Sequence, residues 1–336
     1  MKHRIAINGF GRIGRNVLRA LVEEGYKHDL EIVAINDLAP VDACVWLLKH
    51  DSAQGYFSKE VTTEGNDLIV DGHKIAFLAE KDPSKLPWKE MGVELVMECT
   101  GRFVTKDGAM LHIAAGAKKV LISAPGKGGV DKTIVYGVND NTLTVSDIVV
   151  SNASCTTNCL APVAKVLNDK IGIESGLMVT VHAVTNNQPI VDMLHKDLRR
   201  ARSGMQNIIP TKTGAASAVG LVIPELNGKL DGYALRVPVI DVSMVDLAVN
   251  FARDTSIEEI NSLLKEASET TLKGILGYNT EPLVSGDFMH DSHSSTYDAT
   301  LTKLHGRHGK VCAWYDNEWG FSNRMLDTAQ KMLSVG

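Results

Sequence analysis

The sequence predicts an α/β protein of two domains: a doubly wound parallel sheet, followed by an α+β unit with a mainly antiparallel sheet. Three observations predict this fold class. The chain has 336 residues, enough for two domains of about 150 residues each. Its first half alternates short β-branched runs with helical patterns, whereas long strand candidates dominate beyond residue 173. We therefore expect one domain at 1–151, joined by a C-terminal helix at 318–336, and a second at 152–317.

In the first half, the alternation predicts parallel strands joined by right-handed crossovers. The expected strands are 4–8, 31–36, 94–98, 119–122 and 149–151, and the expected helices are 12–24 and 105–115. The stretch between the second and third of these strands is expected to be irregular. Ser154 and Cys155 follow the last of these strands.

In the second half, few helices separate the strand candidates, which predicts an antiparallel sheet with helices on one face. The expected strands are 173–183, 230–237, 242–251 and 310–315, and a closing helix is expected at 318–333. Between the first two lies 184–210, a long polar stretch with little periodicity, and a loop of that length usually has a function.

Composition excludes several classes of protein. A net charge of -5 argues against nucleic acid as the main partner, and no apolar run is long enough to span a membrane. The apolar stretch after the basic start is too short for a signal peptide and predicts a buried strand instead. The five cysteines are odd in number and show no C-x-x-C pair, which favours a reducing, cytoplasmic location.

A glycine-rich run, GFGRIG, starts at Gly9 directly after the first strand and opens a helix. Such a turn lets backbone approach a pyrophosphate, and the helix start offers N–H donors to it. Asp37 ends the second strand, where an acidic residue binds a ribose 2′-hydroxyl and repels a 2′-phosphate. This spacing predicts a Rossmann domain that prefers NAD to NADP. The alternative is a structural turn with a solvated Asp37.

A candidate nucleophile lies in the run SNASCTTNC. Ser154 is a suitable N-cap, which would place Cys155 in the first turn of a helix, where the helix dipole and free N–H groups stabilise a thiolate. The alternative is a small buried cysteine. Cys159 lies one helical turn further on; a metal pair would need a His or Cys cluster that is missing, so we interpret it as packing and expect no metal.

His182 is the candidate base among eleven histidines, because it lies in an apolar strand where an imidazole is costly unless used or satisfied. A hydrogen-bonded core histidine is the alternative. Three further features predict an anion site: the basic run 195–202, the Thr213-Gly214 pair before a helical run, and Arg236 inside an apolar strand. The basic run lacks interleaved aromatics, so a nucleic-acid patch ranks low against a solvated face or subunit contact.

These pieces closely resemble the phosphorylating glyceraldehyde-3-phosphate dehydrogenases. The resemblance covers essentially the whole chain, from AINGFGRIGR at 6–15 to WYDNEWG at 314–320. Segments 151–162 and 229–238 match the family pattern almost residue for residue. The resemblance implies NAD-dependent oxidative phosphorylation of D-glyceraldehyde 3-phosphate to 1,3-bisphosphoglycerate, a reaction of glycolysis and gluconeogenesis. It also implies that the protein is a homotetramer.

The resemblance also implies roles for individual residues. Cys155 would be the nucleophile and His182 the base; a hemithioacetal passes hydride to NAD, and inorganic phosphate attacks the resulting thioester. The residues that match the two anion sites of the family are Ser154, Thr156, Thr185, Arg200, Thr213, Gly214 and Arg236. The residues expected to bind the cofactor are Gly9, Phe10, Gly11, Arg12, Ile13, Asp37, Lys81, Ser123 and Asn317.

Some positions depart from the family pattern, namely Lys81, Asn187, Pro189 and Leu194, and they bear on selectivity between NAD and NADP. The nearest alternative function is that of the erythrose-4-phosphate dehydrogenases, which have the same nucleophile but depend little on bound phosphate. The Thr213-Gly214 pair and Asp37 favour the triose enzyme. A thiol-sensing or NAD-binding protein without turnover is disfavoured by the presence of both Cys155 and His182, because a pure binding module needs neither.

Overall fold

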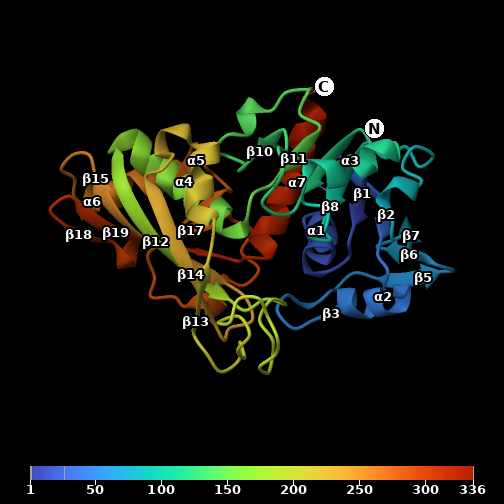
Figure 1. Ribbon diagram of the computed structural model, residues 1–336. Helices are drawn as coiled ribbons and strands as arrows, with labels where there is room; N and C mark the ends of the chain where they lie inside the picture. Colours follow the sequence, from blue (N-terminus) through green and yellow to red (C-terminus); the bar gives the residue numbers. More distant parts are fainter. Residues whose placement is uncertain (1, 26, 336) are drawn as a thin grey trace. The chain divides into compact units, whose positions relative to one another are not determined.

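The computed structural model describes residues 2–25 and 27–335 (Figure 1). They form two compact units. The first comprises 1–136, 140–153 and 322–336, and the second comprises 137–139 and 154–321. Met1 and Gly336, which end the predicted domain spans, lie outside the described residues.

The first unit contains a twisted sheet with strand order β10-β11-β9-β8-β1-β2-β7-β6-β5. Its central strands pair in parallel and are nearly continuously buried, as expected for a sheet covered on both faces. The strands are β1 (His3–Asn8), β2 (Leu30–Asn36), β5 (Val61–Glu64), β6 (Asp67–Val70), β7 (His73–Leu78), β8 (Leu95–Glu98), β9 (Lys119–Ile122), β10 (Lys132–Thr133) and β11 (Val149–Ser151). A separate pair is formed by β3 (His50–Asp51) and β4 (Gly55–Tyr56).

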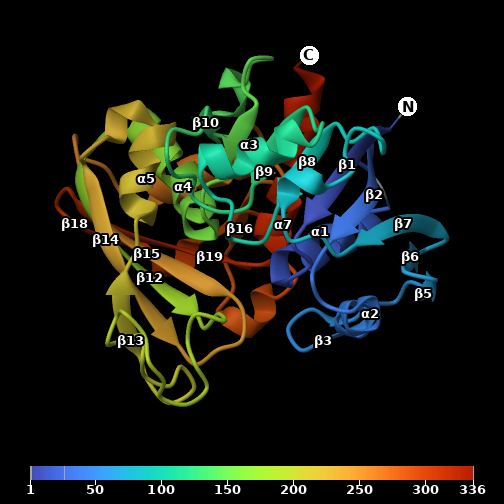
Figure 2. The ribbon, with the colours of Figure 1, turned by 45° about the vertical axis from the view of Figure 1, so that its right-hand side comes forward.

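The stretch expected to be irregular, between β2 and β8, is not: that prediction is wrong. It contains α2 (Val41–Lys49) and the strands β5 to β7, which pair antiparallel with one another before β7 joins β2 in parallel (Figure 2). The exposed residues of β5 and the short length of these strands hide the alternation that would predict them. The other helices that contribute to this unit are α1 (Arg12–Glu23), α3 (Lys106–Ala114) and, from residue 322 onward, α7 (Trp319–Ser334).

The chain order creates a switch point in this sheet. From β1 the chain moves to β2 on one side, and later returns to place β8 on the other side of β1. In open α/β sheets, ligands bind beyond the carboxyl ends of the strands at such a point. Gly9 and Cys99 directly follow the two strands that flank it.

The second unit contains a sheet with order β13-β14-β12-β15-β19-β17-β16, in which most neighbours are antiparallel and β12 with β14 and β16 with β17 are parallel. The strands are β12 (Ile173–Ala183), β13 (Ile209–Lys212), β14 (Leu230–Val237), β15 (Ser243–Phe251), β16 (Leu276–Asn279), β17 (Ser295–Asp298), β18 (Lys303–His305) and β19 (His308–Tyr315). This sheet and that of the first unit confirm the predicted fold class.

Helix α4 (Cys155–Lys170) packs against β12, β15, β17 and β19, and against α5 (Ala215–Val222) and α6 (Ile257–Glu269). Helices therefore lie against one sheet face, as predicted (Figure 1). Residues 184–208 form neither helix nor strand. Across residues 2–25 and 27–335, no helix is long and apolar enough to cross a membrane.

Candidate active site

Cys155 is the first residue of α4, and Ser154 is its N-cap, as the sequence predicts. The Ser154 hydroxyl accepts a hydrogen bond from the backbone N–H of Thr157 at 3.0 Å, which satisfies one of the donors at the start of the helix. The sulfur of Cys155 therefore lies at the end of a helix where the peptide dipoles carry partial positive charge.

His182 lies opposite this helix start, near the end of β12. Its Nε2 is 3.6 Å from the Sγ of Cys155. Its Nδ1 lies 2.7 Å from the carbonyl oxygen of Ala183, which can only accept. Arg236 Nη1, which can only donate, also lies 2.7 Å from this nitrogen, so the two contacts favour opposite tautomers. In the tautomer with the proton on Nδ1, where Ala183 accepts it, Nε2 can take a proton from the thiol.

Burial governs the protonation of both groups. It raises the pKa of the Cys155 thiol, while the Arg236 charge and hydrogen bonds from Thr156 and the helix start lower it. Burial and Arg236 lower the pKa of His182 from 6.5 to about 3. The helix start thus lowers the pKa of the Cys155 thiol, as predicted, but burial raises it by more. The resting pair is therefore a neutral thiol beside a neutral imidazole.

Arg236 reaches this pair through strand register. β12 and β14 pair in parallel with His182 directly opposite Arg236. Its Nη1 donates to the carbonyl of Ala183 at 2.9 Å and lies 2.7 Å from His182 Nδ1. Its Nε is buried and has no hydrogen-bond partner. A buried guanidinium with a free donor is suited to an anionic ligand.

Tyr315 is a site residue that the sequence analysis missed. Its hydroxyl lies 2.8 Å from the hydroxyls of both Thr156 and Thr180, and its ring packs edge-on to His182 with centroids 6.0 Å apart. Burial raises its pKa, so it remains a phenol. The available signal was a tyrosine within an apolar strand, since a buried phenol needs a hydrogen-bond partner.

The remaining candidates for anion binding lie in the segment before β13, directly after β13 and just after β12. Arg200 Nε donates to the hydroxyl of Thr211 at 2.7 Å. Thr213 accepts the N–H of Ala215, and Gly214 is the N-cap of α5, so this pair opens a helix as predicted. The Thr185 hydroxyl donates to the side-chain oxygen of Gln188 at 3.3 Å.

The first unit contains a cavity of about 270 Å³ at the switch point of its sheet. Its lining includes four of the predicted cofactor residues, Gly9, Gly11, Asp37 and Lys81. Gly9 has φ +95°, and a Cβ there would lie 2.7 Å from the Thr100 nitrogen. A Cβ on Gly14 would lie 2.1 Å from the Gly9 oxygen, so both positions require glycine.

The residues around this cavity suit a dinucleotide. Helix α1 follows Gly11, which makes no side-chain cap bond at the helix start, where a phosphate is favoured. Asp37 Oδ2 accepts the N–H of Phe10 at 2.6 Å and Oδ1 accepts that of Ala39. The carboxylate therefore braces the turn from a position that also lines the cavity.

Other predicted cofactor residues have different surroundings. The guanidinium of Arg12 pairs with Asp51 at 2.5 Å, and Phe10 is buried edge-on against Phe77. Ser123 follows β9, and Ile13 is half-buried in α1. Asn317 belongs to the second unit, where its Oδ1 accepts the Ser243 hydroxyl at 2.6 Å.

Ser243 was also missed by the sequence analysis. Its oxygen accepts the N–H of Ala183 at 3.1 Å while its proton is donated to Asn317, so it ties the residue after His182 to a predicted cofactor contact. Within residues 2–25 and 27–335 no group of His, Cys, Asp and Glu is arranged to hold a metal.

A doubly wound sheet with a glycine-rich phosphate turn, together with a thiol beside an imidazole, defines an NAD-dependent oxidoreductase. Comparison with known families specifies it further. Residues 3–106 match the NAD binding domain of glyceraldehyde 3-phosphate dehydrogenase, and residues 154–317 match its C-terminal domain. The chain belongs to the glyceraldehyde 3-phosphate dehydrogenase family.

Similar proteins extend over the full length. A plasmid-encoded glyceraldehyde-3-phosphate dehydrogenase of Cupriavidus necator is 60% identical, covering 98% of both chains. The glyceraldehyde-3-phosphate dehydrogenase of Pseudomonas aeruginosa is also 60% identical, over 100% of this chain and 99% of its own. Glyceraldehyde-3-phosphate dehydrogenase 1 of Bacillus subtilis is 53% identical over 100% of both.

Proposed function

We propose that this chain oxidises D-glyceraldehyde 3-phosphate in the presence of NAD and inorganic phosphate, and releases 1,3-bisphosphoglycerate. The observation that carries the proposal is the 3.6 Å approach of Cys155 Sγ to Nε2 of His182, whose pKa is lowered by burial and Arg236 so that the imidazole is neutral. The names of the full-length relatives support the same substrate.

In the first step, the Cys155 thiol gives its proton to His182 Nε2 and the sulfur adds to the aldehyde carbon. The carbonyl π bond opens, and the oxygen takes up a proton to form a hemithioacetal. The lowered pKa of His182 favours the second of these transfers, because the imidazolium readily returns the proton to the oxygen.

In the second step, the carbon–hydrogen bond breaks with its electron pair and the hydroxyl proton returns to His182, which leaves a thioester on Cys155. When bound, NAD supplies the hydride acceptor for this oxidation. A phosphate oxygen then attacks the thioester carbon, and the carbon–sulfur bond breaks to regenerate the Cys155 thiolate.

Two anions must be held during this sequence: the substrate phosphate and the attacking phosphate. We assign them to the predicted anion-binding set, Ser154, Thr156, Thr185, Arg200, Thr213, Gly214 and Arg236. Two features support this assignment: the Nε of Arg236, which has no hydrogen-bond partner among the described residues, and the start of α5, where the N-cap Gly214 provides no side-chain acceptor. We further assign Cys155 and His182 as catalytic, and Gly9, Phe10, Gly11, Arg12, Ile13, Asp37, Lys81, Ser123 and Asn317 as cofactor contacts.

We also assign the NAD-binding domain to 1–151 with 318–336 and the catalytic domain to 152–317; the division into compact units supports this. A homotetramer is supported by the exposed apolar side chains of segment 184–208, including Ile190, Leu194 and Leu198, which are 78%, 98% and 82% exposed. A cytoplasmic location is supported by five cysteines that all remain unpaired.

The experiment is an NADH-production assay with glyceraldehyde 3-phosphate and with erythrose 4-phosphate, each with and without phosphate. We expect turnover with the triose phosphate that requires inorganic phosphate. A preference for erythrose 4-phosphate with no phosphate requirement would contradict the proposal. Cys155→Ala, which should retain NAD binding, is the control for background reduction.

A further inference from the structure

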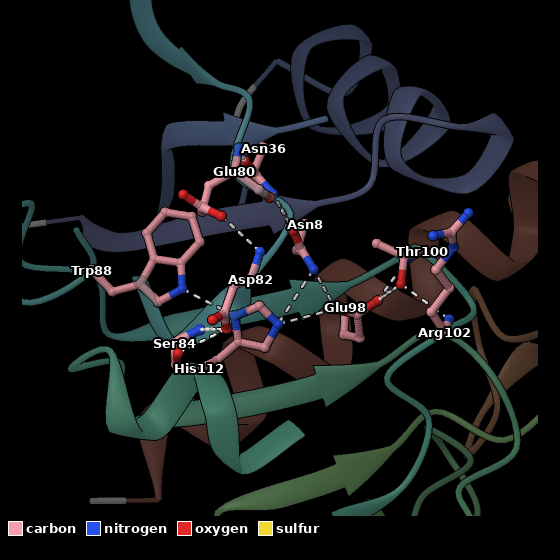
Figure 3. A network of polar contacts seen from close by, with 10 residues as sticks. All are labelled: Asn8, Asn36, Glu80, Asp82, Ser84, Trp88, Glu98, Thr100, Arg102 and His112. Carbon is pink, nitrogen blue, oxygen red and sulfur yellow. Dashed lines mark hydrogen bonds and ion pairs between the residues drawn. The ribbon is translucent and has the colours of Figure 1, made fainter. Parts of the chain in front are cut away.

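A chain of buried polar side chains lies at the edge of the cavity in the first unit (Figure 3). Its centre is Glu98, the last residue of β8, whose side chain is completely buried. One oxygen, Oε1, accepts the backbone N–H of Thr100 at 2.8 Å and also its hydroxyl. The other, Oε2, accepts Asn8 Nδ2 at 2.6 Å and contacts His112 Nε2 at 3.0 Å.

Trp88 determines which tautomer His112 adopts. The indole Nε1 lies 3.0 Å from His112 Nδ1, and both side chains are fully buried. An indole N–H can only donate, so Nδ1 must accept and the imidazole proton is on Nε2. His112 therefore donates to Glu98. The carboxylate receives four donors, the full complement that a buried charge requires.

These four bonds join two strand ends beneath the phosphate-binding turn. Asn8 ends β1, and Thr100 follows β8; both line the cavity. Between them, the Cα of Gly9 packs so closely on 99–100 that an added Cβ would lie 2.8 Å from the Cys99 carbonyl carbon. The position of the Thr100 amide, held by Glu98, therefore limits where Gly9 can lie.

The network continues along the cavity lining to Asn36 and Glu80. Asn8 Oδ1 accepts Asn36 Nδ2 at 2.8 Å, and Asn36 Oδ1 accepts the N–H of Glu80 at 2.8 Å. Asn36 and Glu80 both line the cavity. A core needs no such arrangement, because apolar side chains of similar volume would avoid the cost of burying a charge.

We propose that Glu98, oriented by His112 and Trp88, is a positioning residue for the NAD site. It holds Asn8 and Thr100 against the Gly9 turn so that the turn keeps the shape that binds the cofactor. The proposal rests on NAD being the cofactor. It assigns Glu98 no part in the chemistry at Cys155.

The test is Glu98→Gln, which keeps the shape but replaces one acceptor oxygen by an NH₂ group. If that group faces Asn8 and His112, it meets two donors; if it faces Thr100, it meets the backbone N–H. We expect the dissociation constant for NAD, measured by titration calorimetry, to rise about tenfold, on the scale of one lost charge-assisted hydrogen bond. At saturating NAD, kcat should change by less than about threefold.

A double variant tests the tautomer of His112. In Trp88→Phe, His112 loses the donor that fixes its tautomer, so in the double variant W88F/E98Q it can place its proton on Nδ1 and accept from the new amide at Nε2. We expect the double variant to bind NAD no more weakly than E98Q alone, although two hydrogen-bonding groups have been removed. A purely structural role predicts that the two losses add.

The matched control is Glu31→Gln, which makes the same charge change on an exposed strand residue and should leave NAD binding unchanged. If E98Q does not fold, as judged by circular dichroism, His112→Gln removes one donor from Glu98 and should also weaken NAD binding. Folded E98Q, or in its place His112→Gln, binding NAD as the wild type does would overturn this inference alone, as would a double variant that binds NAD more weakly than E98Q. A wild-type protein that binds no NAD would overturn the cofactor assignment as well.

Discussion

The sulfur of Cys155 and the Nε2 of His182 lie 3.6 Å apart, with the thiol buried and the imidazole neutral. Burial makes the thiol a poor nucleophile by itself, because it disfavours the thiolate. A neutral imidazole with its proton on Nδ1 removes this difficulty, since Nε2 can then take the thiol proton as the sulfur attacks. We therefore expect activation of the sulfur to depend on His182.

His182→Asn is therefore expected to slow alkylation of Cys155 by iodoacetamide at pH 7 by at least about tenfold. Because the pKa of Cys155 is raised above its ordinary 9.0, the rate in this variant should keep rising with pH through 9. Peptide mapping by mass spectrometry separates Cys155 from the other cysteines, and Cys155→Ala gives the background. Equal rates in the variant and the wild type would mean that His182 does not activate the sulfur.

The lowered pKa of His182 also predicts an effect on stability. The unfolded chain binds a proton to this histidine near pH 6.5, whereas the folded chain does so only near 3. Between these values the unfolded state holds more protons, so stability is lost as pH falls. From pH 7 to pH 5 this loss is about 2 kcal/mol in the free energy of unfolding.

Denaturant titrations at the two pH values check this effect. His182→Gln should lose about 2 kcal/mol less than the wild type on acidification. The exposed His305→Gln should behave as the wild type does. If all three proteins lose the same stability, His182 is not held neutral by burial.

Arg236→Gln tests the anion site. Loss of the guanidinium should raise KM for inorganic phosphate or for the triose phosphate by at least about tenfold, because a charge-assisted contact is removed. Steady-state kinetics with each anion varied in turn identifies which of the two Arg236 binds. Arg307→Gln, an exposed arginine near Glu174, is the control. An unchanged KM for both anions would exclude Arg236 from either site.

Asp37→Asn tests cofactor choice. The amide oxygen can still accept the Phe10 N–H, but the negative charge that repels a 2′-phosphate is gone. The ratio of kcat/KM for NADP to that for NAD should rise about tenfold. A wild-type preference for NADP, or an unchanged ratio in the variant, would contradict the role assigned to Asp37.

Local patterns were sufficient for much of the fold. The strands Ile173–Ala183 and Leu230–Val237 were predicted with the bounds that the structure has, because apolar residues recur along both runs although polar residues interrupt them. The N-cap at Ser154 followed from hydroxyl chemistry at a strand-to-helix junction. Segment 37–93 was misjudged because its strands are short and partly exposed.

Contacts between segments that are distant in the sequence could not be predicted from local patterns. The sequence marked Arg236 as a charge in need of a partner, but not its pairing opposite His182, which depends on the register of β12 and β14. Glu98, His112 and Trp88 lie on separate elements, and no local periodicity connects them. Tyr315 and Ser243 likewise gained their significance only from the partners that the fold provides.

The central claim is that Cys155 forms a covalent bond to the substrate carbon and is acylated by its oxidation. Intact-mass and peptide mass spectrometry of enzyme treated with glyceraldehyde 3-phosphate and NAD, in the absence of phosphate, tests it most directly. We expect one acyl group on Cys155, which adds the mass of the substrate less two hydrogen atoms and is removed when phosphate is added. NADH formation under these conditions without any adduct on Cys155 would contradict the account.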